Sequence, residues 1–123
     1  MAEELISRQH DLLRLICNAT ENLKKLGSAY ITRGSVQVRL DQLDRNWAKF
    51  EDQHDDVIKY KNDAKFKGDV YFTEDVYARA ETAYYENKAE FFDLLEQLTT
   101  SSISGVQNFA TNAPVRSIQK SLP

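Results

Sequence analysis

The feature that most constrains the fold is a line of mostly apolar side chains at alternating steps of four and three residues. Its members are Val36, Leu40, Leu43, Trp47, Phe50, His54, Val57 and Lys61. On an α-helix this alternation keeps successive positions on one side, as in a coiled coil or a tightly packed helical hairpin. The pattern therefore predicts a helix near residues 35–63 that buries this seam against neighbouring helices, with Ser35 as its N-cap. The two polar members, His54 and Lys61, are interpreted as fixing the register of the packing.

A helix before the seam is predicted near residues 3–26. Apolar residues recur there on one helical face, namely Leu5, Leu12, Ile16, Ala19, Leu23 and Leu26. Gly27 follows directly, and glycine readily adopts the left-handed conformation that ends many helices. Residues 28–34 then form a short connection. Cys17 lies among apolar neighbours and is predicted to be a small buried thiol.

A helix after the seam is predicted near residues 73–98, with Thr73 as its N-cap and two acidic residues near its positive end. It carries two apolar stripes. The first comprises Tyr77, Ala80, Tyr84, Phe91, Leu94 and Leu98. The second, offset by one residue, comprises Ala78, Tyr85, Phe92 and Leu95. Two stripes imply two neighbours, inside the chain or from another copy.

Together these segments predict an all-α fold. The second and third helices form an antiparallel hairpin across the turn at Lys67 and Gly68, and the first completes a three-helix bundle. This first helix is expected to pack either within the chain or onto a second copy. Residues 1–98 are thus predicted to form a helical association domain. Residues 99–123 are rich in Ser, Thr and Asn and lack helical periodicity, which predicts a flexible linker or tail.

Charge and hydropathy limit the classes of partner that this chain is expected to bind. There are 16 basic and 19 acidic residues, giving a net charge of −3, and the basic residues nowhere form the stripe that a phosphate backbone demands. Direct nucleic-acid binding is therefore not expected. No stretch approaches the roughly 18 consecutive apolar residues of a membrane span, and the acidic N-terminus lacks the apolar run of a signal peptide. A cytoplasmic protein without membrane contact is predicted.

The sequence offers little with which to build a catalytic or metal site. His10 and His54 are far apart, and neither a Gly-rich phosphate loop nor a nucleophile elbow is present. In the acidic segment 51–56, Asp52 has the helical spacing of a metal ligand with Asp55 or Asp56, but His54 belongs to the seam. A solvated acidic face is the preferred interpretation. We therefore expect no enzymatic activity, no cofactor and no metal.

The aromatic residues allow two interpretations. Trp47 and Phe50 could stack on a ligand, but aromatics at seam spacing are usually core, which we predict. The tyrosines near the ends of the second and third helices suit an interface or internal packing equally well; they are Tyr60, Tyr71, Tyr77, Tyr84 and Tyr85. Our candidates for a second contact surface are Tyr84, Tyr85, Phe91 and Phe92.

Three segments carry a family resemblance. The segment from Val38 to Phe50 resembles the Arg-Leu-x-x-Leu-x-x-x-Trp-x-x-Phe pattern of Gag-like regions in insect Bel/Pao-type retrotransposons. The segment from Tyr71 to Tyr77 is similar to the next element of that family, and Val115–Pro123 is similar to the linker that follows. The resemblance implies a Gag-type N-terminal region, or a domesticated derivative, that self-associates during particle assembly. Zinc-knuckle cysteines and the Asp-Thr/Ser-Gly protease motif are absent.

We therefore expect a non-enzymatic structural module that binds copies of itself or other protein helices. Self-association as a homo-oligomer is the first hypothesis. The alternative is a monomeric adaptor that holds a partner's amphipathic helix in a groove between its own helices.

Overall fold

The computed structural model describes the backbone of residues 2–110 and the side chains of residues 2–100. The three long helices are α1 (Ala2–Cys17), α3 (Arg33–Val57) and α5 (Val76–Ala110). Short elements connect them, namely α2 (Ala19–Lys24), α4 (Val70–Thr73) and the 3₁₀ turns η1 (Ser28–Tyr30) and η2 (Ile58–Tyr60). Among the described residues there is no strand, so the predicted all-α class is confirmed.

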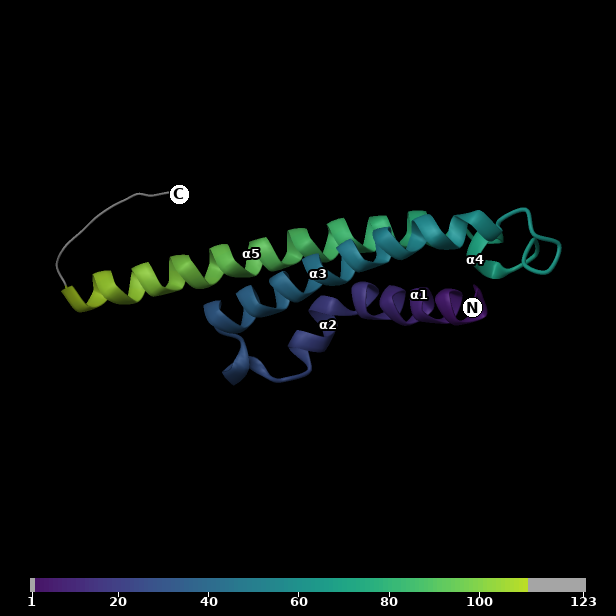
Figure 1. Cartoon of the computed structure of the whole chain (residues 1–123). Helices are drawn as coiled ribbons and strands as arrows, with labels where there is room; N and C mark the ends of the chain where they lie inside the picture. Colours follow the sequence, from purple (N-terminus) through teal and green to yellow (C-terminus); the bar gives the residue numbers. More distant parts are fainter. Residues whose placement is uncertain (1, 111–123) are drawn as a thin grey trace.

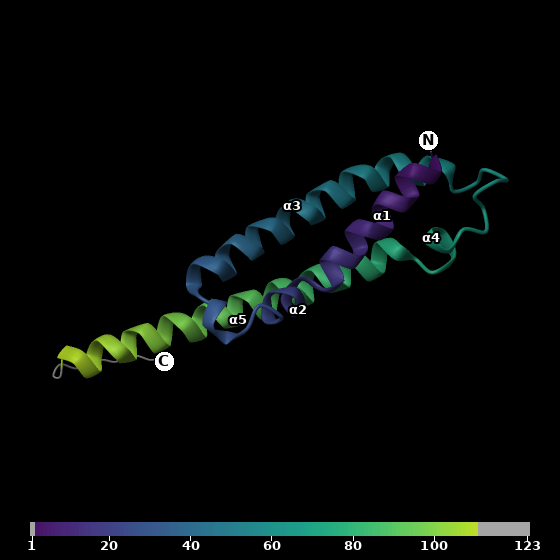
Figure 2. The same cartoon turned by 90° about the horizontal axis from the view of Figure 1, so that it is seen from below.

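The long helices form the predicted bundle. The chain runs along α3, turns through η2 and α4, and returns along α5 in the opposite direction (Figure 1). Helix α1 contacts both and, seen from below, lies between α3 and α5 (Figure 2). In this single chain it packs on the hairpin of α3 and α5. Helix α5 continues past the first turn of α3, so its C-terminal part projects beyond the bundle (Figures 1 and 2).

The seam of α3 forms the centre of the core. Its apolar members are all buried, namely Val36, Leu40, Leu43, Trp47, Phe50 and Val57. His54 is half-buried, as suits a polar residue at the edge of the seam. Lys61 is exposed, so its assignment to the seam is wrong. The α-helix ends at Val57, and the following 3₁₀ turn changes the register before Lys61 is reached.

The first helix is interrupted where the sequence predicted one continuous element. Asn18, with φ −105° and ψ 16°, separates α1 from α2. Gly27 has the predicted positive φ of 94°, but its ψ of 153° is far from the left-handed helical value of about 47°. Gly27 therefore leads the chain away in an extended direction and does not form the predicted left-handed cap.

The N-cap of α3 is Thr32, and the prediction of Ser35 is wrong. The Thr32 hydroxyl accepts a hydrogen bond from the Ser35 amide at 3.1 Å, and the Ser35 hydroxyl accepts one from the Thr32 amide at 2.9 Å. This reciprocal pair is a capping box, in which Ser35 occupies the third helical position. Ser35 therefore does take part in the capping box, but from the third helical position.

Both predicted ends of the third helix need correction. Thr73 is the last residue of α4, and Asp75 accepts the amide hydrogen bond of Ala78 at 3.2 Å at the start of α5. At the other end, α5 continues past Leu98 to Ala110, so Thr99–Ala110 is helical where a flexible tail was predicted. Residues 111–123, the rest of that predicted tail, lie outside the described residues. None of the helices within residues 2–110 combines the length and apolar character needed to cross a bilayer.

Candidate association surface

An aromatic cluster around Trp47 joins α3 to α5. The indole is only 7% exposed and stacks on Tyr84, with ring centroids 5.0 Å apart and planes at 12°. It also stacks on Phe50, with ring centroids 5.8 Å apart, and the ring centroid of Tyr77 lies 5.7 Å away. Offset stacking of this kind stabilises aromatic pairs beyond the area they bury. Trp47 and Phe50 are therefore core residues, as predicted, and not a ligand-stacking pair.

Tyr84 is fastened within the chain. Its hydroxyl donates to the Asp44 carboxylate at 2.7 Å and accepts from the Lys88 ammonium at 2.9 Å, while Lys88 and Asp44 pair at 3.1 Å. Phe91, one of the other candidate contact residues, is fully buried. Both side chains are therefore used by the bundle itself, and neither is available to a second protein.

A second polar link, missed in the sequence, passes through Gln9. This α1 side chain is fully buried, and its amide donates to the Phe50 carbonyl at 2.9 Å and to the Tyr71 hydroxyl at 3.1 Å. The same hydroxyl lies 2.7 Å from Nδ1 of His54. Burial raises the pKa of Tyr71 to about 12 and lowers the pKa of His54. At neutral pH the phenol therefore donates and the neutral imidazole accepts.

Helix α2 is capped by a residue of α5. The first amides of a helix lack partners within it, and the Asn18 side chain makes no capping bond. Instead, the side-chain oxygen Oδ1 of Asn87 accepts from the backbone amide of Thr20 at 3.0 Å and from the Thr20 hydroxyl at 2.9 Å. A Lys24–Glu90 ion pair at 2.7 Å lies beside this link. Together these bonds hold the end of the first segment against α5.

The opposite side of α5 has no such partners within the described residues. Five of its side chains, at alternating steps of four and three, are exposed and are here named the outer stripe: Ala78, Thr82, Tyr85, Ala89 and Phe92. The two large rings are 59% exposed at Tyr85 and 52% exposed at Phe92. Leu95, predicted to belong to this side, is half-buried. Of the four candidate contact residues, Tyr85 and Phe92 thus remain available.

A hollow of about 380 Å³ adjoins the outer stripe where α1 ends against α5. It is lined by Cys17, Ala78, Arg79, Thr82, Ala83 and Glu86. Cys17 is exposed, so the prediction of a buried thiol is wrong, because the residue stands at the last position of α1 beside this hollow. Partial burial nevertheless raises the pKa of the thiol, which keeps it largely protonated at neutral pH. The lining of the hollow combines small side chains with one charge of each sign.

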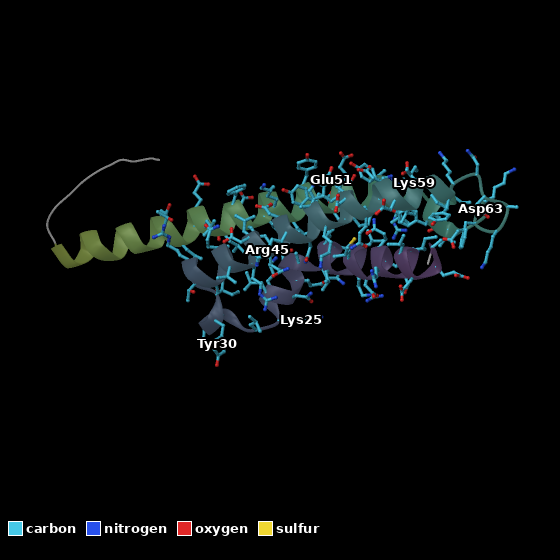
Figure 3. The ribbon with its side chains drawn as sticks, in the orientation of Figure 1. Lys25, Tyr30, Arg45, Glu51, Lys59 and Asp63 are labelled. Carbon is cyan, nitrogen blue, oxygen red and sulfur yellow. The ribbon has the colours of Figure 1, made fainter. Side chains whose placement is uncertain are left out.

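The acidic segment of α3 forms a separate hollow of about 420 Å³, lined by Ala48, Glu51, Asp52, His54, Asp55 and Tyr77. Within the described part of the chain, no group of three potential ligand side chains is arranged to hold a metal ion. Nδ1 of His54 is hydrogen-bonded to the Tyr71 hydroxyl, and the Glu51 carboxylate accepts a hydrogen bond from the Tyr77 hydroxyl at 3.1 Å. Glu51 and Lys59 lie on the side of α3 away from α1 (Figure 3). This arrangement is that of a solvated charged face.

The sequence contains a signal for these polar links. The first stripe of the third helix steps from Tyr84 to Phe91, and Asn87 fills the helical position between them. Gln9 likewise stands between Ile6 and Leu13 on the buried face of α1. Both polar residues stand between two buried apolar members of a stripe, and a polar group buried in this way is almost always hydrogen-bonded.

Comparison of the chain with protein-family models, curated proteins and solved structures found no match.

Proposed function

We propose that this chain is a non-enzymatic module that associates with a second copy of itself through the outer stripe of α5. The observation that carries the proposal is the exposure of Tyr85 and Phe92 on a helix whose other side is already packed. Burying apolar surface contributes roughly 25 cal/mol per Å². Large exposed rings in a row are therefore a source of binding free energy that the isolated chain leaves unused.

The internal contacts support this division of α5 into two sides. The inner side carries Tyr84, Asn87 and Phe91, whose contacts are with the rest of the bundle. The outer stripe is not needed for that packing, yet it keeps the four-and-three spacing with which helices pair. Tyr and Phe are also enriched at protein interfaces.

The resemblance to Gag-like regions of Bel/Pao-type retrotransposons adds a biological setting to the proposal. The matching residues Leu40, Trp47 and Phe50 are buried, so the pattern is one of packing within the chain. In that setting the bundle would be the rigid unit and the outer stripe the contact through which Gag-like chains assemble in the cytoplasm.

Molar mass measured by sedimentation equilibrium over a range of protein concentrations tests the proposal. We expect the mass to rise with concentration, and the double variant Tyr85→Ser/Phe92→Ser to stay monomeric with an unchanged helical circular dichroism spectrum. Tyr30→Ser is the matched control, because Tyr30 is 67% exposed but projects from the connection before α3 (Figure 3). A wild-type chain that stays monomeric throughout would overturn self-association and favour an adaptor for a partner's helix.

A further inference from the structure

We infer that two copies of this chain pair antiparallel along their outer stripes, with Phe92 of each copy seated in the Cys17 hollow of the other. The inference rests on the proposed self-association and specifies its geometry. It is carried by three features of α5: the alternation of large and small side chains, the position of the hollow, and the distribution of charge beside the stripe.

The side-chain sizes select the orientation. From Thr82 to Phe92 the outer stripe alternates small and large side chains, namely Thr82, Tyr85, Ala89 and Phe92. When two such helices run antiparallel, Tyr85 faces the partner's Ala89 while Phe92 faces the partner's Thr82. Each of these layers then combines one large and one small side chain, which fills space evenly. A parallel pairing in register would instead place ring against ring in some layers and leave gaps in the others.

The hollow lies where this register needs it. Thr82 is the residue that faces the partner's Phe92, and it lines the hollow together with Ala78 and Ala83. The hollow measures about 380 Å³, and Cys17 of α1 is also among its lining residues. Helices that pair by this spacing insert each large side chain into a space between four residues of the facing helix. The ring of Phe92 therefore has a receiving site on the partner, and by symmetry the partner's ring has one here.

The charges on one flank of the stripe agree with the same register. Arg79 and Asp93 stand one position after Ala78 and Phe92, respectively, and are both exposed. The antiparallel register brings Arg79 beside the partner's Asp93, and the two-fold symmetry repeats the pair. Arg79 is already 3.4 Å from Glu74, but both side chains of that pair are more than half exposed, so it is weak and readily exchanged.

Two like-charged residues lie near the two-fold axis. Lys88 would approach the partner's Lys88, but its charge is already paired with Asp44 at 3.1 Å and its ammonium lies 5.2 Å from the centre of the Tyr84 ring. Glu86 would approach the partner's Glu86 without such compensation among the ion pairs of residues 2–100. Only the Glu86 contact therefore opposes this geometry.

Charge reversal in the full chain tests the register. The variants Arg79→Asp and Asp93→Arg each replace two attractive contacts by two repulsive ones, so each alone should weaken self-association roughly tenfold or more. Mixing the two variants restores both attractive pairs in the heterodimer, and association should recover. Arg45→Asp, at an exposed position on α3, is the control and should leave association unchanged. Single variants that associate like the wild type, or a mixture that does not recover, would contradict the register.

The sole cysteine provides a second measurement. If Phe92 of the partner covers the hollow, alkylation of Cys17 should slow as the protein concentration rises through the association range. Phe92→Ala should abolish this protection, whereas Tyr30→Ala should preserve it. An associated wild-type chain with freely reactive Cys17 would refute the inferred geometry but leave self-association standing, whereas a wild-type monomer would remove both.

Discussion

At the scale of single residues, Gln9, Tyr71 and His54 join three segments that are far apart in the chain. Gln9 belongs to α1, His54 to α3 and Tyr71 to α4, and all three meet at one phenolic oxygen. Because the phenol donates to His54, the arrangement needs a neutral imidazole. A proton on Nδ1 would turn that acceptor into a donor, and the phenol would then receive two donors and lose its own acceptor.

Stability should consequently fall in mildly acidic solution. Burial lowers the pKa of His54 below 6.5, while the nearby carboxylates Asp55 and Asp75 act weakly in the opposite sense. A histidine whose pKa is lowered by folding contributes its full stability above the unfolded value, and this contribution declines as the pH falls below about 6.5. Urea unfolding at several pH values checks this.

The histidine variants separate this effect from the general effect of acid. His54→Gln should flatten the pH dependence between about pH 5 and 7, the range in which histidine titrates. His10→Gln removes a ring that packs edge-on against Tyr71 but leaves the bond between Tyr71 and His54 in place, so it should keep the decline. An equal decline in the His54→Gln variant would show that other groups cause it.

At the scale of the helices, the parts that the sequence could predict are those set by periodicity. The apolar residues from Val36 to Val57 lie on one side of α3 because each residue of a helix is rotated by a fixed angle from the one before it. The seam and the hairpin could therefore be predicted from the spacing of apolar residues. The ends of the helices depend on local competition among capping residues. Thr32 and Ser35 both carry a hydroxyl close to the start of α3 in the sequence. Only their hydrogen bonds in the structure show which of them is the N-cap.

The candidate contact residues were only half predictable for a related reason. Tyr84 and Tyr85 are adjacent, as are Phe91 and Phe92, and periodicity shows that they form two stripes. Which stripe is buried depends on the side from which α1 and α3 pack against α5. The spacing of residues along α5 alone does not specify that side. The exposure of Cys17 depends similarly on the break at Asn18, where no glycine or proline marks the end of α1.

The link between α2 and α5 should be worth a measurable part of the stability. Asn87→Ala leaves the Thr20 amide without an acceptor at a buried helix start, which costs about 1–3 kcal/mol. Chemical denaturation of the variant measures this loss. Asn46→Ala is the matched control, because the Asn46 side chain accepts an exposed hydrogen bond from Gln42 within the same helix, and a loss of about 0.5 kcal/mol or less is expected there. Equal losses in the two variants would mean that the link does not hold α2.

At the scale of the whole molecule, the bundle is an elongated body with one long helix that is packed on one side only. Helix α5 contacts α1, α2 and α3, and its outer stripe is exposed. Since the inner contacts are complete without this stripe, changes to the outer side should alter association without altering the fold. Electrostatic changes serve this purpose best, because they remove no packed atoms.

Glu86 gives the clearest such change. In the antiparallel pair it meets its own counterpart near the two-fold axis, so Glu86→Gln removes a repulsion and should strengthen association severalfold, about the effect of a single exposed charge pair. Asp41→Asn is the control, since it changes the net charge equally but lies on the exposed side of α3. Both variants should unfold at nearly the same urea concentration as the wild type. Sedimentation equilibrium at low ionic strength measures the difference, and added salt should reduce it. If Asp41→Asn strengthened association as much as Glu86→Gln does, the effect would come from net charge. The two Glu86 side chains would then not lie close together in the dimer.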